Sequence, residues 1–224
     1  MIKITQEFVP DVELAIANAK QLVAQFDIRA RQNVVLWLDL LGFAKQLITD
    51  RETALLRIAV FHELTLLSVY EECHVAQLND ATVISLDFSE EDDPQKLTNF
   101  LCRCDVLFEK VTHADRLVGG FGARGVLSIG HRQGLRGNFG GIALDKELTL
   151  DKIRFSSPPS IMMNMAFAKS YAVESSHRLL KEPSLYVEEC LFRRFKIQVS
   201  PTWSNNGRVE LDGDNFCIVR RDTE

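Results

Sequence analysis

Two aspartates lie beside segments rich in β-forming residues. Asp39 ends the apolar stretch "NVVLWLDLLGF" (33–43), and Asp80 lies between the two β-rich arms of "QLNDATVISLDF" (77–88). If these strands are neighbours, both carboxylates converge at one edge of a sheet. Two like charges about 4 Å apart repel by about 4 kcal/mol at an effective dielectric of 20, so a proton or a divalent cation must offset them. Mg²⁺ and Mn²⁺ favour a few carboxylates completed by phosphates. The pair therefore predicts a two-metal site for a triphosphate.

The residues after Asp39 could hold the phosphates themselves. Leu40, Leu41, Gly42 and Phe43 precede a polar, helix-like segment, and backbone N–H groups at the start of a helix bind phosphate. A simpler interpretation stays open, in which Asp39 only caps that helix and Asn79-Asp80 is only a tight turn.

The spacing of apolar residues predicts the elements that position these side chains. We expect helices over 10–30, 44–72 with a break near Thr49-Asp50, 93–110 and 157–180. Strands are expected over 33–38, as strand, turn and strand over 119–144, and as a final hairpin or strand over 208–222. A β-hairpin is expected over 73–88, and a short strand followed by a helix or loop over 184–195. This order predicts an α+β fold, with a mainly antiparallel sheet and helices on one face. We divide the chain into an N-terminal helical extension, 1–30, and a catalytic domain, 31–224.

The composition is that of an ordinary globular protein of 224 residues with a formal net charge of −5. This charge argues against nonspecific binding to nucleic acid or acidic membranes. The sequence has no apolar stretch long enough to span a bilayer, and its N-terminus does not resemble a signal peptide. The five cysteines lack the spacing of a disulfide framework or a zinc site, so we expect reduced thiols and a cytoplasmic protein.

Four motifs resemble those of the class III nucleotide cyclases, in the order of that family. They are "VVLWLDLLGF", "QLNDATVISLDF", "GARGVLSIG" and "SIMMNMAFAKSYAVE". The resemblance implies a ferredoxin-like fold and a head-to-tail homodimer whose sites lie between subunits. It also implies that Asp39 and Asp80 bind two Mn²⁺ or Mg²⁺ ions. The reaction would be attack of a ribose 3′-hydroxyl on the α-phosphate, giving a 3′,5′-cyclic nucleotide and pyrophosphate.

The chain departs from the family's pattern where the base is read. Purine cyclases carry Lys or Glu four residues before the second metal aspartate, where this chain has Ala76. Gln77 is a candidate for base recognition, although strand alternation could turn it to the other face. The change suggests a pyrimidine substrate, UTP or CTP. The chain resembles the stand-alone cyclases of bacterial Pycsar anti-phage defence, which make cyclic UMP or cyclic CMP for a separate effector protein. Arg124 is the candidate contact to base or phosphate.

A second departure concerns the helix that follows. The family's helix carries an Asn and, four residues later, an Arg that stabilises charge on the α-phosphate. Asn164 matches the Asn, but Ala168 stands at the position of the Arg, so Lys169 is the candidate substitute. Losing such a donor typically costs 10²–10³ in rate. Three alternatives therefore stay open: a purine cyclase, a cyclase-fold module that binds nucleotide without turnover, and a structural dimerisation domain.

Overall fold

The computed structural model describes residues 9–23, 27–69, 72–89, 92–134, 138–139, 142–143, 148–150, 153–155, 164–176, 179, 181–200, 203–211 and 213–221. The helices are α1 (Val9–Val23), α2 (Phe43–Thr49), α3 (Arg51–Ser68), α4 (Pro94–Leu117), α6 (Met165–Glu174) and α7 (Glu189–Val199). The strands are β1 (Asp27–Leu40), β2 (Cys73–Gln77), β3 (Ala81–Phe88), β4 (Ala123–Gly134), β5 (Asn138–Phe139), β6 (Ile142–Ala143), β7 (Leu148–Leu150), β8 (Ile153–Phe155), β9 (Ser184–Glu188), β10 (Arg208–Leu211) and β11 (Asp214–Arg221).

The centre of the sheet has the ferredoxin-like arrangement. The nine strands of the main sheet lie in the order β10-β11-β9-β4-β1-β3-β2-β8-β7. Its core, β4-β1-β3-β2, is antiparallel throughout, with α3 connecting β1 to β2 and α4 connecting β3 to β4. Two neighbouring pairs elsewhere, β4 with β9 and β2 with β8, are parallel. The predicted α+β class and mainly antiparallel sheet are therefore confirmed.

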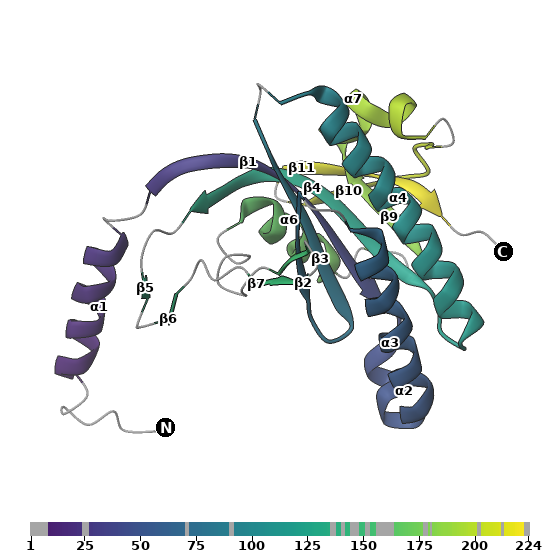
Figure 1. Ribbon diagram of the computed structural model, residues 1–224, viewed down its shortest axis with the longest axis horizontal. Coiled ribbons are helices and arrows are strands. Elements are labelled where there is room, and N and C mark those ends of the chain that lie inside the picture. Colours follow the sequence, from purple (N-terminus) through teal and green to yellow (C-terminus); the bar gives the residue numbers. More distant parts are fainter. Residues whose placement is uncertain are drawn as a thin grey trace.

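β1 supplies side chains to two separate cores because residues alternate between the faces of a strand. Leu36 and Leu38 pack in the larger core with residues of α3, α4 and α7, which lie over one face of the sheet (Figure 1). Val35 and Trp37 pack on the other face with α6. We expected helices on one face only, and α6 is the exception among the described helices. The ring of Trp37 lies 5.6 Å from the rings of both Phe167 and Tyr171, which α6 contributes.

The expected breaks between elements occur where capping residues stand. Asp50 separates α2 from α3, and its side chain accepts a hydrogen bond from the N–H of Thr53. Asp93 caps α4 in the same way, with Pro94 as the first helical residue. β2 and β3 form the predicted hairpin around Asn79-Asp80. The two last strands, β10 and β11, form a hairpin, which is one of the two alternatives expected for 208–222.

α1 lies apart from the sheet, beyond the end at which β1 begins with Asp27 (Figure 1). Its described side chains, 12–21, are exposed, including the apolar Val12, Leu14 and Ile16. The expected division at residue 30 remains a prediction, and β1 already begins at Asp27. Among the described helices, none combines the length and the apolar character that crossing a bilayer requires.

Candidate active site

Asp39 and Asp80 come together at one end of the sheet. β1 pairs with β3 so that Asp39 lies opposite Ala81, the residue after Asp80. The N–H of Leu40 donates to the carbonyl oxygen of Asp80 at 3.0 Å, which fixes the tip of the hairpin beside the end of β1. The convergence of the two aspartates follows from this register.

The acidity of Asp39 reflects this crowded position. Burial, together with the negative charges of Glu174 and Asp80, raises the pKa of Asp39 from 3.8 to about 8, although Arg124 and Arg57 oppose the shift. The carboxyl group is therefore protonated at neutral pH when no cation is bound. A cation placed between the two aspartates would replace that proton, as expected for a metal site.

Arg124 is the cation nearest to this pair in the strand register. It lies opposite Asp39 on β4, and its Nη1 is 3.1 Å from Oε1 of Glu174, near the end of α6. Both side chains are largely buried. Glu174 was missed by the sequence analysis, because nothing in "SYAVESS" separates it from an exposed helical glutamate. The site therefore contains three carboxylates and a guanidinium, drawn from β1, the β2–β3 turn, β4 and α6.

Some backbone N–H groups of the segment expected to bind phosphate, residues 40–43, already have acceptors within the protein. The N–H groups of Leu40 and Leu41 already donate to the carbonyls of Asp80 and Gly122, both at 3.0 Å. Gly42 adopts a left-handed backbone, φ +68°, and α2 begins at the next residue, Phe43. The N–H groups of a first helical turn have no acceptor within the helix. The expectation for this segment therefore narrows to Gly42 and Phe43.

Gln77 does not lie with this group. Its side-chain amide donates to the carbonyl of His62 in α3 at 3.3 Å, on the face of the sheet opposite α6. Ala76, one residue earlier, packs in the α6-side core. The alternation of β2 therefore turns Gln77 away from the aspartates, and the expectation that it reads the base at this site is not supported.

Asn164 and Lys169 lie toward the other end of the same face. Asn164 caps α6 by accepting from the N–H of Ala166 at 2.9 Å, and its amide donates to Oδ1 of Asn33 at 2.6 Å. Asn33 and Asp39 are six residues apart on β1, or about 20 Å at 3.3 Å per residue. One chain therefore does not bring Asn164 to its own Asp39.

Lys169 is held by two carboxylates. Its Nζ lies 3.0 Å from Glu188 and 3.1 Å from Asp214. Burial alone would lower the pKa of Lys169, but these two partners raise it above its usual value. The ammonium is charged and occupied, so a phosphate would compete with two carboxylates for it.

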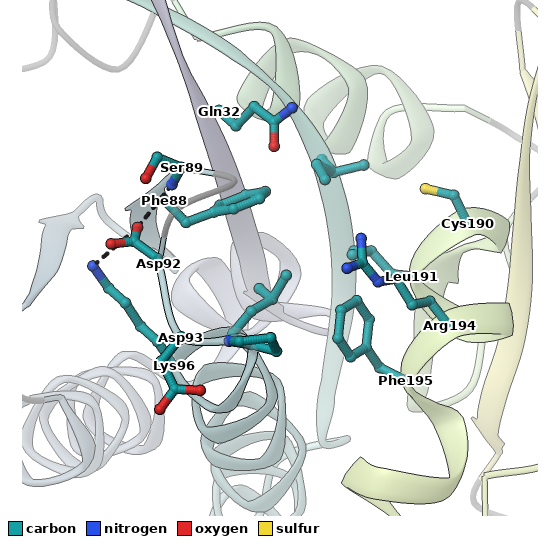
Figure 2. A pocket seen from close by; sticks show the side chains of 13 residues that line it. Gln32, Phe88, Ser89, Asp92, Asp93, Lys96, Cys190, Leu191, Arg194 and Phe195 are labelled. Carbon is teal, nitrogen blue, oxygen red and sulfur yellow. Dashed lines mark hydrogen bonds and ion pairs between the residues drawn. The ribbon is translucent and has the colours of Figure 1, made fainter.

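A cavity of about 440 Å³ opens elsewhere, at the beginning of β1 (Figure 2). Figure 2 shows it between Phe88 and Lys96 on one side and Leu191, Arg194 and Phe195 of α7 on the other. β1 contributes Gln32 to its lining, seven residues from Asp39, so the cavity is separate from the aspartate pair.

The carboxylates of Asp39 and Asp80 fit a metal ion whose remaining ligands come from a substrate. Among the described residues, no three His, Cys, Asp or Glu side chains form a ready-made metal cluster. Asp39 and Asp80 would thus supply two carboxylates only. Mg²⁺ and Mn²⁺ bind in this way when phosphates and water complete the coordination.

Comparisons with known proteins give likenesses in structure but none in sequence. No family model matches the sequence, and no curated protein matches it. The guanylyl cyclase Cya2, a solved structure, is similar over 84% of this chain and 92% of its own, with a TM-score of 0.48 and 11% sequence identity.

Proposed function

We propose that the protein is a metal-dependent nucleotide cyclase of the class III type. The observation that carries the proposal is the meeting of Asp39, Asp80 and Arg124 at one sheet end. The four resembling motifs run along the chain in the family's order, and the ferredoxin-like core places their strands side by side. Two carboxylates suit a pair of divalent cations, and a neighbouring guanidinium suits a phosphate.

In the proposed reaction, the 3′-hydroxyl of the ribose releases its proton to solvent, and its oxygen forms a bond to the α-phosphorus while the bond to the pyrophosphate oxygen breaks. Asp39 and Asp80 would hold Mn²⁺ or Mg²⁺, which lowers the pKa of an attacking hydroxyl and stabilises leaving oxygens. Gly42 and Phe43 would donate backbone N–H groups to the phosphates. Arg124 would exchange its Glu174 partner for a phosphate oxygen.

The finer proposal is a pyrimidine substrate, UTP or CTP, and a second messenger used in anti-phage defence through a separate effector. Ala76 supports it, because a methyl group on the α6 face cannot read a purine by hydrogen bonding. A homodimer would complete the site, since Asn164 and Lys169 lie far from the aspartates of their own chain.

A cyclase-fold module without turnover is the second candidate. Three observations favour it: Arg124, Asn164 and Lys169 are each engaged by side chains of the same chain. This candidate predicts nucleotide binding without product.

The deciding experiment incubates the protein with Mn²⁺ and each of the four ribonucleoside triphosphates, and identifies products by mass spectrometry. We expect a cyclic nucleotide and pyrophosphate from UTP or CTP.

Asp39→Ala should lower the rate by at least about 100-fold, because the site loses a metal ligand. Asp92→Ala, between the opposite end of β3 and α4, is the matched control and should keep full activity. A cyclic purine product would overturn only the base assignment, and no cyclic product from any triphosphate would overturn the catalytic proposal.

A further inference from the structure

An arginine inside the protein closes a ring of hydrogen bonds around the turn that follows Asp39. Arg57 of α3 donates from Nη2 to the carbonyl of Leu41 at 2.9 Å, and from Nε and Nη2 to the carboxylate of Asp115 at 2.7 and 2.9 Å. Asp115 accepts from the N–H of Gly122 at 2.8 Å, and the carbonyl of Gly122 accepts from the N–H of Leu41 at 3.0 Å. These bonds join α3, α4, the start of β4 and the turn after β1.

The two charged side chains of the ring are buried. The side chains of Arg57 and Asp115 are 0% and 2% exposed. Removing a buried ion pair in favour of apolar residues is often neutral or stabilising, so stability alone is a weak explanation for the pair. The pair instead fixes the orientation of the groups around it, because a planar guanidinium bonds a carboxylate and a carbonyl in one plane.

The same arginine reaches the turn by a second route. Arg57 donates from Nη1 to the side-chain carbonyl of Gln46 in α2. The Gln46 side chain donates to the carbonyl of Gly119 at 3.2 Å, and its backbone N–H donates to the carbonyl of Gly42 at 3.1 Å. Both ends of the Leu41-Gly42 turn are thus tied to one guanidinium.

Close packing leaves the turn little room to move. A Cβ added to Gly120 would lie 2.0 Å from a carboxylate oxygen of Asp115 and 2.4 Å from Nε of Arg57. A Cβ added to Gly42 would lie 2.9 Å from the ring of Phe121, and Phe121 itself lies 5.8 Å from the guanidinium. Gly120 is therefore the residue that lets the chain pass close to the Arg57–Asp115 pair.

We infer that Arg57 and Asp115 are positioning residues, which hold the Leu41-Gly42 turn so that the N–H groups of Gly42 and Phe43 face a phosphate beside Asp39. The inference rests on the proposed function, since it assigns the turn a phosphate ligand. Neither residue touches the substrate. They act through the carbonyl of Leu41 and the N–H of Gly122.

The test replaces the whole pair, Arg57→Met with Asp115→Leu, so that no buried charge is left without a partner. The chain offers a matched control in Arg220 and Asp105, which also form a two-bond pair, at 2.6 and 2.7 Å. Asp105 stands ten residues before Asp115 on α4, about 15 Å along the helix. Arg220→Met with Asp105→Leu removes a more exposed pair away from the turn, together with the acceptor of the Trp203 indole N–H, so it is the more demanding control for lost stability.

Two measurements are made well below the melting temperature of every variant. Hydrogen–deuterium exchange follows the amides of residues 41–46 and 119–122 without ligand. Calorimetry follows the binding of inorganic tripolyphosphate with Mn²⁺. In the Arg57/Asp115 variant, we expect exchange in both segments to accelerate about tenfold or more, and affinity to fall by about 10- to 100-fold. The Arg220/Asp105 variant should match the wild type in both measurements.

A folded Arg57/Asp115 variant with wild-type exchange and affinity would overturn the inference. So would equal losses in both variants, because they would mark a general effect of lost stability. Arg57→Lys keeps the charge without the planar fork, and it should fall short of the wild type in affinity. If the wild type itself binds no tripolyphosphate, the phosphate role of the turn fails, whereas the exchange measurement still decides whether the ring holds the turn. The cyclase proposal is decided separately, by product formation from the four ribonucleoside triphosphates.

Discussion

At the scale of single residues, Asp39 is held in a position that costs stability. Its pKa of about 8 in the folded chain, raised by burial, Glu174 and Asp80, compares with 3.8 for an ordinary aspartate. Between these values the folded state keeps a proton that the unfolded state releases. The free energy of unfolding therefore falls as pH rises through this window, by up to about 1.4 kcal/mol per pH unit, and levels off above pH 8.

Asp39→Asn cannot ionise, so we expect it to remove this dependence. Without divalent cations, its melting temperature should exceed that of the wild type by several degrees at pH 8, and by much less at pH 5. Thermal unfolding followed by circular dichroism across this range checks the expectation. Asp92→Asn provides the comparison, and a variant less stable than the wild type at pH 8 would contradict the account.

At the scale of elements, the N-terminus of α6 depends on one side chain. Asn164 caps the helix and supplies the amide that the buried Asn33 accepts from. Asn164→Ala removes the bond to Asn33 and the two bonds from the N–H groups of Ala166 and Phe167, and we expect a loss of about 2 kcal/mol or more in the free energy of unfolding. Asn164→Ser keeps a cap and should recover about 1 kcal/mol of it. Urea denaturation measures both, and an alanine variant as stable as the wild type would refute the capping role.

The sequence anticipated the elements better than the contacts of their side chains. Asp39, Asp80 and Arg124 were predictable because each stands at the end or start of a recognisable strand. The role expected of Gln77 is not supported, because its side chain contacts α3 while that of its neighbour Ala76 faces α6. Asn164 fits the family's position, but its contacts with Asn33 and the helix start depend on packing that no motif records.

The position of Arg57 in the sequence indicates that its side chain is buried. It falls at helical spacing with Ala54, Phe61 and Thr65, which are the buried residues of α3. An arginine on a buried helical face requires a partner. The partner, Asp115, is 58 residues away in the sequence, so only the fold identifies it.

At the scale of the whole molecule, the face covered by α6 is divided between two ends. Asp39 and Asp80 occupy one end, and Asn164 occupies the other, about 20 Å away along β1. If both ends serve one reaction, they must come from two chains. We expect specific activity to fall on dilution, in parallel with the loss of dimer measured by light scattering. Constant activity in a preparation that scatters as a monomer would exclude shared sites.

The placement of the two tryptophans gives this chain a built-in optical probe. Trp37 stands two residues before Asp39, against the aromatic rings of α6, whereas Trp203 lies in the core on the opposite face, bonded to Asp105. Each indole therefore samples a different side of the sheet. Emission from the first reports on the neighbourhood of the aspartates, and emission from the second reports on the general integrity of the molecule, with no dye attached.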